Sequence, residues 1–220
     1  KGQAGASDDA WAATGVSIDS RTCRQGDLFV AITGENFDGH DFLADAFKAG
    51  AAAAITSRDS DQIDACGSPL IRVDDGLHAL GNLGRAARDR TDAPVVAITG
   101  SVGKTGTKEA LRQCLERSGS THASVASYNN MWGVPLSMAR MPRDTAFAIF
   151  EVGMNHAGEI SPLARLVRPH VVIITTVEAT HLEFFDGIEG IADAKAEIFD
   201  GLEAGGVAIL NKDNGQYARL

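Results

Sequence analysis

VVAITGSVGKT, residues 95–105, is the stretch of the chain that decides its fold. Residues 95–99 predict a buried strand, and the glycine turn that follows leads directly into a helical pattern from Thr105. Glycines let backbone N–H groups approach phosphate oxygens, the start of a helix carries partial positive charge, lysine neutralises negative charge, and a threonine hydroxyl ligates Mg²⁺. Strand, glycine loop and helix in this order predict a nucleotide-phosphate site in an α/β domain.

The loop is a shortened form of the usual phosphate-binding pattern, because Ile98 stands where the longer pattern has glycine. A glycine turn that precedes a helix by chance is the alternative, and the adjacent strand together with the Lys-Thr pair argues against it. The predicted ATP-binding residues are Thr99, Gly100, Ser101, Val102, Gly103, Lys104, Thr105 and Gly106.

Continuous apolar runs recur in the second part of the chain, as expected of parallel strands that are covered on both faces. They occupy residues 95–99, 146–150, 171–177 and 207–210, and helical patterns lie between them at 105–117, 134–140 and 188–202. These patterns predict a doubly wound, mostly parallel sheet over residues 93–220.

Smaller elements fill the first part of the chain. Strands are predicted at 27–32, 51–55 and 70–73, and helices at 42–49 and 77–90. The polar stretch at 89–92, just before Pro94, is typical of a domain boundary. We therefore predict a small α/β domain over residues 1–92, followed by the phosphate-binding domain over residues 93–220.

The composition narrows the possible partners and the compartment. A formal net charge of −9 over 220 residues argues against a nucleic-acid partner or an anionic membrane surface. No apolar run reaches the about 18 to 20 residues that a membrane-spanning helix needs. Three cysteines without metal-type spacing favour a reducing compartment, the cytoplasm. We expect a soluble monomer with no membrane insertion, and a fragment, because the chain starts without Met and ends without a terminating pattern.

Polar residues follow two of the predicted parallel strands at the sheet edge where ligands bind in such folds. Glu151 follows the strand at 146–150, and Glu178 and His181 follow the strand at 171–177. Carboxylate oxygen suits Mg²⁺, whereas imidazole is a less usual partner that could instead orient a second ion or a phosphate. A helix N-cap or a surface position is the alternative for Glu151. We predict that Glu151 and His181 serve a metal ion beside Lys104.

Lys195 lies on the apolar stripe of the predicted helix at 188–202. Burying an unpaired ammonium is costly, so the side chain either snorkels to the surface or has its nitrogen chemically occupied. A carbamate on Lys195 would reverse its charge and create a Mg²⁺ ligand, although the spacing of residues alone does not show one.

Two further polar clusters, Asn129-Asn130 and Asn155-His156, lie in predicted loops. Turn formation is the simpler explanation for both clusters. Their side chains could also donate hydrogen bonds to phosphate or sugar oxygens of a bound substrate.

Motifs along nearly the whole chain resemble the Mur ligase family of peptidoglycan synthesis, most closely its MurF type. SIDSR at 17–21, GDLFVA at 26–31 and GENFDGH at 34–40 are similar to its N-terminal, uridine-nucleotide-recognising domain. TGSVGKTGT at 99–107 resembles its ATP loop. YNN at 128–130 with GVP at 133–135, and EVGMNH at 151–156 with GEI at 158–160, resemble segments that distinguish the MurF type.

The resemblance implies an ATP-dependent ligase that adds D-alanyl-D-alanine to UDP-N-acetylmuramoyl-tripeptide through an acyl phosphate. It implies catalytic roles for Lys104, Lys195 and His181, with Lys195 carbamylated. The Mg²⁺ site would use Thr105, Glu151, His181 and Lys195. Ile18, Ser20, Asn36 and Phe37 would bind the UDP end of the substrate, and Asn129, Asn130, Asn155 and His156 would face it in the cleft. The family's third, C-terminal domain has no counterpart here.

Two loop positions depart from the family pattern, since Val102 replaces a common Asn and Gly106 a common Thr. Backbone cradling of phosphate should survive both changes. Two other functions remain open: a sibling Mur ligase that adds a single amino acid, and a module that binds nucleotide without turnover.

Overall fold

The computed structural model describes residues 3–4, 11–34, 36–58, 68–125, 128–180 and 182–220. The chain divides into two compact units, residues 1–83 and 84–220, each of which holds a five-stranded sheet. Helix α3 (Gly76–Asp89) spans the division. The α/β class predicted from the sequence is confirmed, and the domain boundary near residue 92 stays a prediction.

The first unit contains a sheet in the order β1-β5-β4-β3-β2. Its parallel strands are β2 (Gly15–Ser17), β3 (Asp27–Val30), β4 (Ala53–Thr56) and β5 (Leu70–Arg72), and the short β1 (Gln3–Ala4) pairs antiparallel with β5. Phe29 and Ala54 of this sheet pack against Leu43 and Ala46 of α1 (Leu43–Lys48), which is preceded by the 3-10 helix η1 (Gly39–Phe42). The sequence carries no clear signal for β2, because three residues are too few to show a period.

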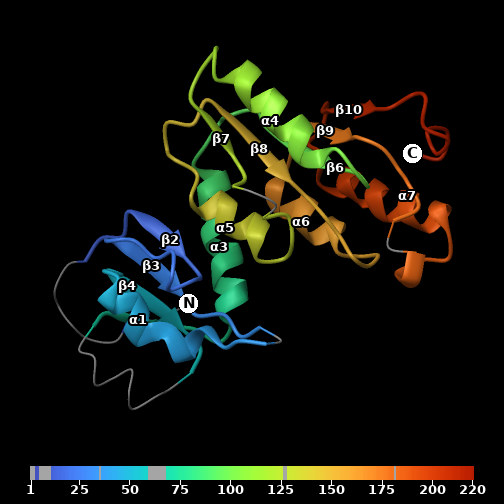
Figure 1. The fold of residues 1–220 in the computed structure, drawn as a ribbon. Helices are drawn as coiled ribbons and strands as arrows, with labels where there is room; N and C mark the ends of the chain where they lie inside the picture. The colour runs from blue at the N-terminus through green and yellow to red at the C-terminus, as the bar shows by residue number, and fades with distance from the viewer. Residues whose placement is uncertain (1–2, 5–10, 35, 59–67, 126–127, 181) are drawn as a thin grey trace. The chain divides into compact units, whose positions relative to one another are not determined.

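The second unit contains a wholly parallel sheet in the order β10-β9-β6-β8-β7. Its strands are β6 (Val95–Thr99), β7 (Thr121–Ala123), β8 (Phe147–Glu151), β9 (Val171–Ile174) and β10 (Val207–Leu210). From β6 the chain adds β7 and β8 on one side and then β9 and β10 on the other (Figure 1). This order confirms the predicted doubly wound sheet.

Helices cover both faces of the middle of the second sheet, where the strands are apolar. The strand at 207–210 was expected to be covered on both faces, but it is the edge strand β10, and its Val207 and Ile209 are 54% and 49% exposed. Val95 and Ala97 of β6 join the core formed with α5 (Gly133–Ala139), α6 (Ile160–Val167) and α7 (Ile188–Ala196). Val96 and Ile98 pack on the opposite face, against α4 (Lys104–Leu115). Consecutive residues of β6 point to opposite faces of the sheet, and both faces are covered at this strand. Every residue of β6 is therefore buried.

The segment predicted as one helix at 188–202 is in fact two elements, α7 and the 3-10 helix η3 (Glu197–Gly201). Gly201 lies so close to α6 that an added Cβ would sit 2.0 Å from the Ala164 carbonyl oxygen. Glu197 accepts hydrogen bonds from the backbone N–H groups of Gly158, Ile160 and Ser161, so it caps α6. The tight packing of η3 on α6 accounts for the change from α to 3-10 geometry.

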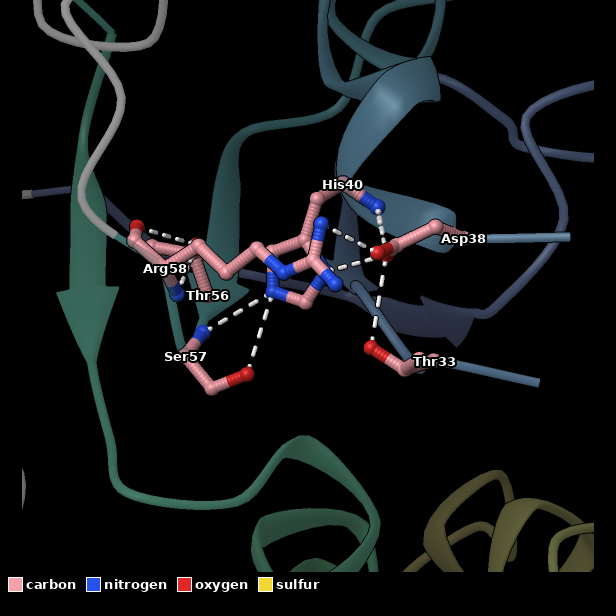
Figure 2. A network of polar contacts seen from close by, with 6 residues as sticks. All are labelled: Thr33, Asp38, His40, Thr56, Ser57 and Arg58. Carbon is pink, nitrogen blue, oxygen red and sulfur yellow. Dashed lines mark hydrogen bonds and ion pairs between the residues drawn. The ribbon is translucent and has the colours of Figure 1, made fainter.

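In the first unit, a buried polar network ties together the loops that follow β3 and β4 (Figure 2). His40 is 8% exposed, and its Nε2 accepts a hydrogen bond from the Ser57 backbone N–H at 3.0 Å. Because a backbone nitrogen can only donate, Nε2 carries the lone pair, and the hydrogen is on Nδ1. Nδ1 therefore donates to Asp38 Oδ1 at 2.5 Å, and His40 is the neutral tautomer.

Asp38 is the other centre of this network. Its Oδ1 also accepts hydrogen bonds from the His40 backbone at 3.0 Å and from Thr33 Oγ1 at 3.4 Å, and Arg58 Nη1 lies 2.6 Å from Oδ2 as an ion pair. Burial raises the pKa of Asp38, but the hydrogen bonds from His40 and the charge of Arg58 outweigh burial and lower the pKa. An ionised Asp38 thus anchors the loop that carries Asn36 and Phe37.

Replacing His40 with leucine should destabilise the first unit by about 1–3 kcal/mol, because Asp38 loses a donor and the Ser57 N–H loses its acceptor in a buried place. The matched control is His78→Leu on the exposed surface of α3. Chemical denaturation of both variants measures the difference. Equal stability of His40→Leu and the control would contradict the structural role assigned to His40.

Candidate nucleotide-phosphate site

The glycine loop at 100–103 connects the end of β6 to the start of α4, as the sequence predicts. Gly100 and Gly103 have φ angles of 145° and 86°, which favour glycine. An added Cβ at Gly100 would also sit 2.0 Å from Thr175 Oγ1. Gly103 is the N-cap residue of α4, so the first N–H groups of this helix open toward the loop. The loop therefore has the backbone geometry that phosphate recognition needs.

Lys104, the first residue of α4, folds back over the loop, and its Nζ donates to the Gly100 carbonyl oxygen at 2.7 Å. Burial lowers the pKa of Lys104, and the nearby Glu151 carboxylate partly opposes this effect. The ammonium is thus held at the loop by a neutral acceptor that an anion could replace.

Glu151 lies at the carboxyl end of β8 and is 1% exposed. Its Oε2 accepts a hydrogen bond from Thr105 Oγ1 at 2.9 Å, and its Oε1 accepts one from Asn129 Nδ2 at 2.8 Å. The backbone N–H of Gly153 donates to the Asn129 carbonyl at 2.8 Å. These contacts bring three of the predicted site residues into one cluster, although 46 residues separate Thr105 from Glu151.

Lys195 lies near the end of α7, is 3% exposed and does not snorkel to the surface. Burial, reinforced by the positive charge of Lys104, lowers the pKa of Lys195 from 10.5 to about 8. Among the described residues, its ammonium has no hydrogen-bond or ion-pair partner. Lys195 is therefore a buried amine with a greatly increased neutral fraction.

Residues after β9 hold the other side of the glycine loop. The Ser101 backbone N–H donates to the Thr176 carbonyl at 2.9 Å, and its hydroxyl accepts from the Glu178 N–H at 3.0 Å. Thr175 Oγ1 donates to the Val102 carbonyl at 2.6 Å. Asn214 Nδ2 donates to Thr176 Oγ1 at 2.9 Å. Thr175 and Asn214 carry no sequence signal of their own, because the contacts of Thr175 depend on the pairing of β9 with β6 and those of Asn214 on the pairing of β9 with β10.

The remaining predicted residues lie in varied settings. Asn130 Oδ1 accepts from the Gly133 N–H at 2.9 Å, so its side-chain oxygen shapes a turn. His156 is exposed, and its Nδ1 lies 3.1 Å from Glu159 Oε1. The centroid of its ring lies 4.4 Å from that of the Phe184 ring. Asn155 is also exposed. In the first unit, Ile18 and Ser20 are half-buried, whereas Asn36 and Phe37 are exposed. His181 lies outside the described residues.

Two absences hold for the residues that the structure describes. Within them, no group of three or more His, Cys, Asp or Glu side chains gathers in a way that could hold a metal ion. In the same ranges, no helix has the length and apolar character needed to cross a membrane.

Comparison with known proteins agrees with this geometry. The family model for the Mur ligase middle domain matches residues 98–220, and the model described as "Mur ligase family, catalytic domain" matches residues 12–88. The UDP-N-acetylmuramoyl-tripeptide--D-alanyl-D-alanine ligase of Rickettsia prowazekii (strain Madrid E) is 41% identical over 205 residues, 93% of this chain and 45% of that protein. The ligase of the same name from Escherichia coli (strain K12) is 41% identical over 202 residues, which are 92% of this chain and 44% of that protein.

Solved structures give the same result. MurF from Acinetobacter baumannii matches with a TM-score of 0.83 and 36% identity, over 93% of this chain and 44% of that one. MurF ligase from Thermotoga maritima in complex with ADP matches with a TM-score of 0.80 and 31% identity. The match covers 93% of this chain and 47% of that one. The chain spans less than half the length of these relatives. Because the middle-domain model alone matches more than half of its residues, this chain belongs to the Mur ligase family.

Proposed function

We propose that this chain supplies the ATP site and the UDP-substrate domain of a MurF-type ligase, which joins D-alanyl-D-alanine to UDP-N-acetylmuramoyl-tripeptide. The observation that carries the proposal is the cluster of Lys104, Thr105, Glu151 and Asn129 at the carboxyl edge of a doubly wound sheet. The similarity to MurF proteins, one of them in complex with ADP, supports the choice of nucleotide and of ligase type.

The oxygen atoms of Thr105 and Glu151 fit a Mg²⁺ site. They lie 2.9 Å apart, and two neighbouring ligands of an octahedral Mg²⁺, each about 2.1 Å from the ion, are separated by about 3 Å. The buried Thr99 hydroxyl has no hydrogen-bond partner among the described residues, which leaves a polar atom at the loop entrance for a bound group. When bound, Mg²⁺ would neutralise charge on the phosphates of ATP.

In the proposed reaction, the terminal carboxylate of the tripeptide attacks the γ-phosphorus of ATP, and ADP leaves with the electrons of the broken bond. The amine of D-alanyl-D-alanine, after losing a proton, then attacks the carbonyl carbon of the acyl phosphate. The new C–N bond forms, the C–O bond to phosphate breaks, inorganic phosphate leaves with its electrons, and the nitrogen gives up its remaining extra proton to solvent. Lys104 would exchange the Gly100 carbonyl for phosphate oxygens and stabilise their charge. Asn129 holds Glu151 in place, so this part of the site is preorganised before nucleotide binds.

Lys195 would carry a carbamate. At pH 7 a pKa of about 8 leaves about 10% of the amine neutral, against about 0.03% at the ordinary pKa of 10.5. The neutral nitrogen attacks CO₂, a C–N bond forms, and one proton is lost to solvent. The product is an anion that would pair with Lys104 and provide an oxygen ligand for Mg²⁺, instead of a second buried cation.

The rest of the site follows from the family likeness. His181 would help to hold Mg²⁺ and assist catalysis. Ile18, Ser20, Asn36 and Phe37, in a substrate domain over residues 1–92, would bind the UDP end, and the remaining substrate contacts would come from Asn130, Asn155 and His156 in the ATP domain over residues 93–220. The full ligase would act in the cytoplasm as a monomer. A sibling ligase would instead bind a muramoyl substrate with a shorter peptide.

Ligand-dependent thermal stabilisation tests the nucleotide site, because a ligand that binds only the folded state stabilises it by about 2.7 kcal/mol at 100 times its Kd. Mg-ATP and UDP-N-acetylmuramoyl-tripeptide, added separately, should each raise the melting temperature. Lys104→Ala should abolish the response to Mg-ATP and keep the response to the UDP substrate. The control, Lys48→Ala at an exposed position of α1, should keep both.

An undiminished Mg-ATP response in Lys104→Ala would contradict the assignment of the loop at 100–103 to phosphate binding. Stronger stabilisation by the muramoyl dipeptide than by the tripeptide would favour a sibling ligase over the MurF type.

Carbamylation is tested by ¹³C NMR of the protein in ¹³C-bicarbonate. A carbamate resonance should appear in wild-type protein, weaken as the pH falls below 7, and vanish in Lys195→Arg. The control variant Lys212→Arg, at an exposed lysine, should retain it. A carbamate signal that survives in Lys195→Arg would place the modification elsewhere.

A further inference from the structure

Lys108 is a buried cation that the proposed chemistry does not use. It lies in α4, one helical turn after Lys104, and its side chain is completely buried. Its Nζ donates to the Ser124 carbonyl oxygen at 2.7 Å and lies 3.2 Å from Glu109 Oε1. Because replacing a buried ion pair by apolar side chains of similar volume is often neutral for stability, a buried ammonium is weak evidence of a role in core stability.

Ser124, the partner of Lys108, also contacts the backbone of Glu151. Ser124 follows β7 directly and is almost fully buried. Its backbone N–H donates to the Ile149 carbonyl at 3.1 Å, and its hydroxyl accepts from the Glu151 N–H at 3.4 Å. Lys108 thus holds the residue whose side chain contacts the Glu151 backbone.

The two attachments come from one face of the same helix. Thr105 and Lys108 are three residues apart in α4, so their side chains are neighbours. Thr105 contacts the Glu151 carboxylate, and Lys108 reaches the Glu151 backbone through Ser124. A shift of α4 against β8 would have to break both contacts.

We infer that Lys108 is a positioning residue for the Mg²⁺ and nucleotide site. By fixing Ser124, it keeps the Glu151 carboxylate aligned between Thr105 and Asn129, where the oxygen spacing suits the cation. This role rests on the proposed function, because it assigns a purpose to the alignment of Glu151. It predicts that loss of the ammonium weakens Mg²⁺-dependent nucleotide binding more than it weakens the fold.

The test uses Lys108→Met, with Lys48→Met as the control at an exposed lysine. The first measurement is the Mg²⁺ concentration needed for half of the ADP-induced rise in melting temperature. Lys108→Met should need at least about tenfold more Mg²⁺ than wild type, a ratio that corresponds to about 1.4 kcal/mol. Ser124→Ala keeps the carbonyl and removes the hydroxyl, and it should also raise the Mg²⁺ concentration that is needed. This variant provides the test if Lys108→Met does not fold.

The second measurement is amide hydrogen exchange of the ligand-free variants. Exchange should rise in the segments 121–125 and 147–153 of Lys108→Met and stay unchanged in α6. An unchanged Mg²⁺ requirement, unchanged exchange, or an increase spread over the whole second unit would each overturn the positioning role. Absence of any Mg-ADP response in wild-type protein would instead contradict the proposed function, and the exchange comparison would still decide whether Lys108 aligns the segment.

Discussion

The site depends on one buried carboxylate. Glu151 lies at the end of a parallel strand, almost without access to solvent, and a charge in that position must be hydrogen-bonded or neutralised. Thr105 from the helix after the glycine loop and Asn129 from the connection after β7 provide the hydrogen bonds. The pairing of β6 with β8 brings these segments together, so the sheet order determines the chemistry of the site.

The surroundings of Glu151 are unusually cationic for a chain of net charge −9. Lys195 is buried and Lys104 half-buried near the loop, and burial lowers the pKa of each. Among the described residues, these two ammonium groups near the Glu151 carboxylate leave an excess of positive charge, which an anionic ligand or a change of charge on Lys195 would relieve. The same imbalance makes the site receptive to a polyphosphate.

Much of this architecture could be predicted from local sequence. The strands β6 and β10 have the predicted bounds, because each has a run of four apolar residues next to a turn, which leaves little choice for where the strand lies. β7 and α6 carried weaker signals: β7 has three half-buried residues, and Pro162 interrupts the helical pattern of α6. In the structure Pro162 lies in the first turn of α6, where its missing N–H costs nothing.

The site was harder to predict than the fold. Sequence motifs predict roles for Lys104, Thr105, Glu151 and Asn129, and these roles stay predictions. The motifs do not predict the Lys108–Ser124 contact, because it forms only when the residue after β7 packs against α4. The apolar stripe left open whether Lys195 reaches the surface or stays buried; the structure buries it, and its lowered pKa also depends on the proximity of Lys104. Interactions that depend on charge and three-dimensional proximity are not encoded in residue spacing.

The most direct test of the central claim is a crystal structure of the protein grown with Mn²⁺ and ADP, in which anomalous scattering locates the cation. If Thr105 and Glu151 hold the cation, an anomalous peak appears within coordination distance of Thr105 Oγ1 and next to the Glu151 carboxylate, with the ADP phosphates in the loop at 100–103. A Mn²⁺–ADP complex bound elsewhere on the chain, with the Thr105–Glu151 hydrogen bond intact, would contradict this claim.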